Sequence, residues 1–119
     1  MYEDFASWLE SVLEMEFPDS TVALYFNIYE EGDDTWSVQL IATDRFDPDD
    51  SDWACEEIFS TEDDLYTFNR SEDSEYVSEE VCEWVAQYLD MGDKADILKE
   101  YEAVGAGISE GDVNVLYQR

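Results

Sequence analysis

Hydrophobic residues near the start of the chain recur at the spacing of an α-helix. They are Phe5, Trp8, Leu9, Val12 and Leu13. These positions share one helical face, and acidic residues occupy the other face. Because Pro18 disfavours helical backbone at the residue before it, the pattern predicts a first amphipathic helix that ends near Glu16.

From Thr21 the apolar period changes to two, which is typical of a β-strand. One predicted face carries Val22, Leu24, Phe26 and Ile28, and the other carries Ala23, Tyr25, Asn27 and Tyr29. A turn at residues 31–34 leads to a second alternating segment, whose apolar face is Trp36, Val38, Leu40 and Ala42. The two segments are predicted to pair as an antiparallel hairpin.

The middle of the chain is acidic and harder to assign. Residues 44–52 contain five Asp and one Pro, which predicts a loop. The segment from Trp53 to Phe59 fits either a helix or a strand. After an acidic turn at 61–64, the run Leu65–Phe68 is rich in β-forming residues and predicts a further strand.

The second half contains the strongest helical pattern in the chain. Its apolar positions are Val77, Val81, Trp84, Val85, Tyr88 and Leu89. Capping residues at 71–74 precede it, and Gly92 predicts its end. A short helix is expected at 95–101, then a break at Gly105 and Gly107. A tight turn and a last strand through residues 113–117 complete the prediction.

This order predicts one α+β domain over residues 1–119. We expect two layers, with a mainly antiparallel sheet of four to five strands and the helices packed on one face. No internal repeat is evident in the sequence.

The charge of the chain restricts its function more than any motif does. Its 119 residues contain 33 acidic and 5 basic residues and no His, which gives a formal net charge of −28. With 45% hydrophobic and 15% aromatic residues the chain is nevertheless expected to fold. Such a charge repels phosphate backbones and anionic lipids, so neither nucleic acid nor membrane is an expected partner. Without a basic leader or a long apolar run, we expect a soluble, cytoplasmic protein.

The residues needed for common catalytic chemistry are missing. Without His and with only two Lys, nucleophilic triads are excluded, so we expect no enzyme, no catalytic residue and no cofactor. No metal ligand is assigned. The acidic loop fails the EF-hand pattern, which requires a glycine where Asp52 stands and a glutamate where Ile58 stands. Weak, unspecific calcium binding stays open. Cys55 and Cys82 lie in apolar contexts and are expected to be buried free thiols rather than a disulfide.

The acidic residues gather at predicted loops and helix starts. Any one cluster is explained by a solvated surface, but a small domain stays soluble with a net charge of only ~2 to 8. The excess therefore predicts a basic protein partner. The expected contact residues are Glu30, Glu31, Asp33, Asp34, Asp47, Asp49, Asp50, Asp52, Glu56, Glu57, Asp63 and Asp64, with Trp53 and Tyr66 as aromatic anchors. For the two aromatic residues a place in the core is an equal alternative.

In size, acidity, aromatic content and order of elements, the chain resembles the small immunity proteins of bacterial polymorphic and contact-dependent toxin systems. The resemblance includes the stretches Phe26-Asn-Ile-Tyr-Glu30 and Gly107-Ile-Ser-Glu-Gly-Asp112. It implies protection of the producing cell in the cytoplasm, through one-to-one binding to a toxin domain. The resemblance does not identify the toxin, but the acidic charge favours a nuclease with a basic active site. No functional residue is carried over from the family.

Two other functions fit the same charge. One is a DNA mimic, whose carboxylates imitate phosphates and inhibit a nucleic-acid-binding protein. The other is a calcium-binding domain or one adapted to high salt, where the Debye length shrinks to ~3 Å at 1 M.

Overall fold

The computed structural model describes residues 2–61, 64–108 and 113–119, and these form an α+β fold. The elements in chain order are helix α1 (Tyr2–Val12), strands β1 (Ala23–Gly32) and β2 (Thr35–Thr43), 3₁₀-helix η1 (Ser51–Cys55), strands β3 (Glu57–Ser60) and β4 (Tyr66–Asn69), helices α2 (Ser74–Met91) and α3 (Ala95–Leu98), and strands β5 (Ala103–Ile108) and β6 (Asn114–Gln118). The predicted fold class is confirmed. The segment that fitted either helix or strand contains both, because η1 is followed directly by β3.

A single sheet joins the strands in the order β3-β2-β1-β5-β6, and β4 also pairs with β2. The predicted antiparallel hairpin of β1 and β2 is confirmed, with a register that runs from Ala23 opposite Thr43 to Glu30 opposite Trp36. Its two turn residues, Asp33 and Asp34, both have positive φ, as a tight hairpin turn requires. The described residues give six strands, more than the four to five expected.

The additional strand is β5, which lies parallel to β1 near the middle of the sheet. The predicted break at Gly105 and Gly107 is therefore wrong. A Cβ atom at Gly105 would lie 3.3 Å from the ring of Trp53 and 3.0 Å from the backbone oxygen of Asn114. This glycine serves the close approach of neighbouring groups inside a strand, not a turn. Residues 109–112, where the tight turn is expected, lie outside the described part of the chain.

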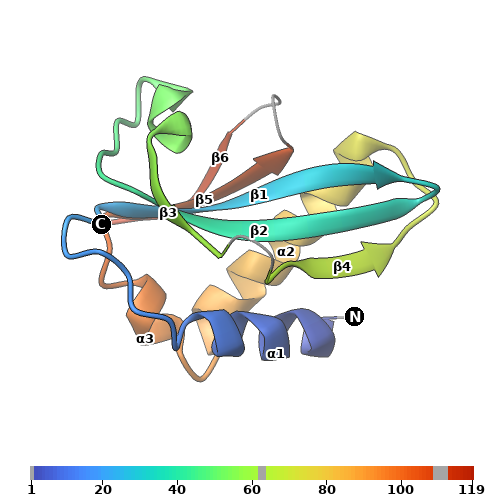
Figure 1. Ribbon diagram of the computed structural model, residues 1–119, viewed down its shortest axis with the longest axis horizontal. Coiled ribbons are helices and arrows are strands. Elements are labelled where there is room, and N and C mark those ends of the chain that lie inside the picture. Colours follow the sequence, from blue (N-terminus) through green and yellow to red (C-terminus); the bar gives the residue numbers. More distant parts are fainter. Residues whose placement is uncertain (1, 62–63, 109–112) are drawn as a thin grey trace.

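The helices α1, α2 and α3 lie on one face of the sheet (Figure 1). This face holds the main core, in which the ring of Phe5 packs against Trp8, Phe26, Tyr66 and Trp84 at centroid distances of 5.4–6.0 Å. The six apolar positions predicted for α2 are all buried. The helix begins at the cap Asp73, whose carboxylate accepts the backbone N–H of Tyr76 at 2.9 Å, and it ends at Gly92 as expected.

Within residues 2–61, 64–108 and 113–119, η1 and the loop before it cover one end of the second face of the sheet (Figure 1). There Trp53, only 1% exposed, packs against Tyr25 at 5.8 Å and Phe46 at 5.0 Å. Farther along the same face, Asn27 donates to the Tyr29 hydroxyl at 2.8 Å, and this hydroxyl donates to Gln39 at 3.1 Å. Three helices thus cover the first face, whereas η1 and the loop before it cover one end of the second.

Helix lengths and cysteine environments differ from the prediction. Helix α1 ends at Val12, four residues before Glu16, because the chain then tightens into a turn in which the Met15 N–H donates to the Val12 carbonyl at 3.1 Å. Helix α3 is likewise shorter than expected. Both cysteines are free, as predicted, but Cys55 is exposed and Cys82 only half-buried. Cys55 is exposed because η1 packs on the sheet through Trp53 and Ala54.

Candidate functional site: two acidic ends joined by a sheet edge

The first acidic surface, here called the hairpin end, combines the β1–β2 turn with the start of α2. Three hydrogen bonds hold these segments together. The Arg70 N–H donates to the Asp34 carbonyl at 2.8 Å, the Ser71 hydroxyl donates to the Asp34 carboxylate at 2.7 Å, and the Trp36 indole donates to the Arg70 carbonyl at 3.0 Å. The hairpin end consists of Glu30, Glu31, Asp33, Asp34, Glu72, Asp73, Glu75 and Glu79, all of them exposed.

Arg70 is the cation nearest to this surface. Its guanidinium binds both oxygens of the Glu80 carboxylate at 2.7 Å. This hydrogen bonding raises the pKa of Arg70, while burial acts in the opposite direction. Arg70 therefore neutralises Glu80 and leaves the exposed carboxylates of the hairpin end to repel one another.

The second acidic surface, here called the loop end, is formed by η1 and the residues on either side of it. Its residues are Asp44, Asp47, Asp49, Asp50, Asp52 and Glu56, of which only Asp47 is partly buried. The Asp47 carboxylate accepts the Asp49 N–H at 2.9 Å, and the Asp50 carboxylate accepts the Asp52 N–H at 3.0 Å. The Arg45 guanidinium lies 3.8 Å from Asp50 and 3.7 Å from Glu56, which are long ion-pair distances. The loop end is thus ordered locally but remains strongly negative.

The aromatic anchors predicted for the partner lie in the core instead. Trp53 is 1% exposed, and its ring is buried against the sheet, which fits the core alternative. Tyr66 is half-buried, and its ring stacks on Phe68 at 5.7 Å. Burial raises the pKa of the Tyr66 hydroxyl, and the nearby carboxylate of Asp4 adds to this. Trp53 thus belongs to the core, whereas Tyr66 packs against the core with part of its surface exposed.

The two acidic ends lie at opposite ends of β2. The first and last of its nine residues are eight intervals apart, which separates the two ends by roughly 26 Å at about 3.3 Å per interval. Strands β3 and β4 both pair with the same edge of β2, β3 near Thr43 and β4 near Thr35. This β3–β4 edge carries Glu57 and leads from the loop end to the hairpin end. The predicted contact residues that the structure describes therefore gather at the two ends of β2, with Glu57 and Asp64 along the edge between them, instead of forming one compact patch. Asp64 adjoins the start of β4, and Asp63 lies outside the described residues.

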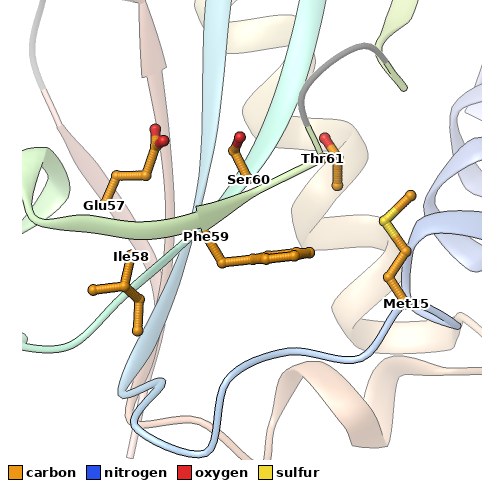
Figure 2. Close-up of a pocket in the computed structure, with 6 residues that line it drawn as sticks. All are labelled: Met15, Glu57, Ile58, Phe59, Ser60 and Thr61. Carbon is orange, nitrogen blue, oxygen red and sulfur yellow. The ribbon is translucent and has the colours of Figure 1, made fainter.

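A pocket of about 520 Å³ opens at β3 (Figure 2). A β-bulge in the pairing with β2 places two residues of β3 opposite one of β2. Figure 2 shows the consequence, since the neighbouring side chains Ile58 and Phe59 lie on the same side of the strand, with the Phe59 ring extending toward Met15, while Glu57 and Ser60 lie on the other side. The pocket therefore has an apolar part and a polar part.

Sequence reasoning did not identify the apolar residues of this pocket. Met15, Ile58 and Phe59 have the spacing and character of ordinary core residues. The sequence gives one indication of this pocket: residues 53–59, which include Ile58, fit either a helix or a strand. A bulged edge strand produces such an ambiguity, because the bulge disturbs the alternation of apolar and polar residues on which strand prediction depends. Ile58 is 37% exposed, which is high for a large apolar side chain.

The described residues offer little to a metal ion or to nucleophilic chemistry. Among them, no three His, Cys, Asp or Glu side chains are grouped so that they could hold a metal ion. Burial raises the pKa of the Cys82 thiol, which disfavours the reactive thiolate. Within the same residues, no helix is both long and apolar enough to cross a membrane. What the described surface offers chemically is negative charge and an open pocket beside a short edge strand.

Comparison of the chain with protein-family models, with curated proteins and with solved structures found no significant match. The functional proposal therefore depends on the surface itself.

Proposed function

We propose that the protein is a non-enzymatic inhibitor that binds and neutralises a basic toxin domain, as the immunity proteins of bacterial toxin systems do, with a nuclease as the favoured target. The observation that carries this proposal is the net charge of −28, with most of the acidic side chains of the two ends exposed. Their mutual repulsion destabilises the compact state, and a cationic surface would relieve it.

The placement of the acids supports a partner with an extended basic surface. The hairpin end and the loop end lie roughly 26 Å apart, and the β3–β4 edge connects them. A nuclease domain presents such a surface where it binds the phosphate backbone of its substrate. Charge of this kind accelerates association, with rate constants that rise to ~10⁸ M⁻¹s⁻¹ or more at low salt.

The test has two steps. The tagged protein is incubated with native lysate of the producing cells, washed at low and then at high salt, and the retained proteins are identified by mass spectrometry. A single basic protein in equal molar amount is expected. That protein is then purified and assayed for its toxic activity, which an equimolar amount of the inhibitor should abolish.

Three results would contradict the proposal. Several DNA-binding proteins released together at high salt would favour a DNA mimic. An empty lane with a melting temperature that rises steeply in molar KCl or millimolar calcium would favour a salt-adapted or calcium-binding domain. A captured protein whose activity is unchanged by the inhibitor would exclude neutralisation.

A further inference from the structure

We infer that a second pocket, between α2 and β6, binds one long cationic side chain, Lys or Arg, of the basic partner. The aliphatic stem lies on the apolar part of the pocket, and the charged head group lies between two glutamates of α2. This inference rests on the proposed function, because the basic partner supplies the side chain. It names a contact site outside the residues that the sequence predicts.

The first observation is the pocket itself, which lies where α2 packs beside β6 and has a volume of about 260 Å³. Cys82 of α2 and Leu116 of β6 are partly buried and pack against the main core. The margin of the core therefore reaches solvent in this pocket and gives it an apolar surface. Its lining residues are Ser78, Glu79, Cys82, Glu83, Asn114 and Leu116.

The second observation is a pair of carboxylates that have no cation. Glu79 and Glu83 are both exposed and lie four residues apart on α2, so they are neighbours on one side of the helix. Glu80, next to Glu79, binds the Arg70 guanidinium, whereas no basic side chain of the described residues pairs with Glu79 or Glu83. Like charges at this spacing repel each other. A cation between them would relieve the repulsion.

The Cys82 thiol shows that this negative charge acts inside the pocket. Burial is the main cause that raises the pKa of Cys82, and a hydrogen bond with Ser78 acts in the opposite direction. Glu79 and Glu83 both raise the pKa further. Both carboxylates therefore lie close enough to the thiol to act on a charge at the apolar surface. A positive head group there would be attracted by both glutamates at once.

One kind of group fits both features. Lys and Arg side chains place an aliphatic stem along apolar surface and keep the charged head group in contact with water. A purely apolar side chain would remove water from Glu79 and Glu83 without giving them a partner. A metal ion would not use the apolar surface, and the described residues contain no group of three His, Cys, Asp or Glu suited to hold one. The pocket thus favours a side chain of the basic partner.

The probe is n-butylguanidinium, which reproduces an Arg side chain from its Cα atom outward. Two controls separate its parts: n-butylurea has the stem without the charge, and guanidinium has the charge without the stem. In NMR titrations of the labelled protein at low salt, n-butylguanidinium should bind about fivefold more tightly than either control. Its shift changes should peak over residues 78–83 and 114–116.

Variants of α2 separate local recognition from overall attraction. Glu79→Gln and Glu83→Gln should each weaken binding of n-butylguanidinium about threefold, and the double variant about tenfold. The matched control is Asp90→Asn, which removes one exposed charge from the same helix outside the pocket lining. It should change the affinity by less than about 1.5-fold, because solvent screens a charge at that distance. Far-UV circular dichroism checks that every variant folds.

The thiol provides a second measurement. Cys55→Ser leaves Cys82 as the only cysteine of the chain. In this variant n-butylguanidinium should slow the reaction of Cys82 with N-ethylmaleimide, and an equal concentration of n-butylurea should not.

Three results would overturn the inference. They are equal binding of n-butylurea and n-butylguanidinium, a loss of affinity in Asp90→Asn as large as in Glu79→Gln, and shift changes that peak over residues 57–61 at the β3 pocket. The capture experiment decides the proposed function separately. A toxin neutralised equally by wild type and by the Glu79→Gln, Glu83→Gln double variant would leave that function standing and remove only this contact.

Discussion

The two faces of the sheet are built in different ways. The helix-covered face buries a continuous core in which Phe5 contacts four aromatic rings. The second face has a much smaller cluster centred on Trp53, which includes Tyr25 and the small residues Ala23 and Ala103. The first arrangement spreads stability over many contacts, whereas the second concentrates it at one end and leaves the rest of the face for polar groups. Five predictions test this difference, beginning with the largest expected effect.

The largest loss of stability is expected on the helix-covered face. Phe5→Ala removes a fully buried ring from the centre of the aromatic network, so we expect the free energy of unfolding to fall by about 4 kcal/mol. Urea unfolding followed by far-UV circular dichroism measures it. The control Ser7→Ala, at an exposed position of the same helix, should change stability by less than about 0.5 kcal/mol. A loss below about 2 kcal/mol for Phe5→Ala would show that this core relaxes easily.

The second face should respond less strongly to a substitution of similar size. Trp53→Ala is expected to cost about 3 kcal/mol, because half-buried Phe46 is able to move into part of the space. In NMR spectra of this variant, chemical shifts should change for residues near Tyr25. The chemical shifts of residues packed beneath the helices should not change. Asp52→Ala, beside it but exposed, is the control. An equal or larger loss than for Phe5→Ala would reverse the ranking of the two faces.

The substitution Gly105→Ala tests the close packing of the Trp53 ring on β5, because it enlarges the β5 residue instead of the ring. The added methyl group meets the indole at 3.3 Å and the Asn114 carbonyl at 3.0 Å, and we expect a loss of about 1–2 kcal/mol. In a Trp53→Phe background, where the smaller ring leaves room, the loss should fall below half. A cost that is identical in the two backgrounds would place the strain at Asn114 alone.

The same contrast explains which parts of the fold the sequence predicts. On the helix-covered face every apolar residue of α2 follows one period, so periodicity identifies both the helix and its buried side. On the second face, η1 is only five residues long, and four of the six residues of β5 are Ala or Gly, including Gly105. Neither segment has a regular hydrophobic pattern, and the glycine has meaning only once the indole of Trp53 lies against it. That contact joins residues about 50 positions apart, which local rules do not detect.

The candidate site was predictable in composition but not in arrangement. Acidic residues are visible in the sequence, and unpaired carboxylates are rarely buried. Asp33 and Glu56 are accordingly exposed. Their separation into two ends is a consequence of strand length and register, which fix how far the β1–β2 turn lies from the loop after β2. The pocket at β3 depends on a bulge, a feature that the sequence signals only weakly.

Tyrosine ionisation compares the two faces in one experiment. Burial is the main cause that raises the pKa of Tyr88 among the helices, to about 12, and it raises the pKa of Tyr25 on the second face still further. Since the unfolded chain ionises these hydroxyls near pH 10, their contribution to stability is complete below pH 10. It is lost as the pH rises toward the folded value.

The urea concentration at the midpoint of unfolding should therefore decrease between pH 10 and 12. For the variant Tyr88→Phe this midpoint should decrease less steeply over the same range, because the variant lacks one of the buried hydroxyls. Tyr25→Phe should reduce the slope in the same direction, and its effect should extend to higher pH. Midpoints that stay constant from pH 9 to 12 would contradict the burial of both hydroxyls. Spectrophotometric titration of the folded protein provides an independent check.

The smallest effect on stability is expected from replacing the two arginines, Arg70 beside α2 and Arg45 over the second face. Arg70 joins the sheet to α2 through two contacts of 2.7 Å with Glu80, and both side chains are less than one quarter exposed. Arg45, over the second face, makes only contacts of 3.7–3.8 Å, and its side chain is 44% exposed. Paired geometry and partial burial favour the first interaction, while solvent and salt weaken the second.

Arg70→Met should therefore lower stability by about 1 kcal/mol, and Arg45→Met should produce no measurable change. A double-mutant cycle of Arg70→Met with Glu80→Gln isolates the pair from the general repulsion among acids, because the effect of each substitution on other groups cancels and only the interaction between the two side chains is left. At 1 M KCl the coupling should persist in part, since a partly buried pair is screened less than an exposed one. If the cycle gives no coupling, the hairpin end is held to α2 by its backbone hydrogen bonds, such as that from Arg70 to Asp34, and the charge of Arg70 serves only to reduce repulsion at that end.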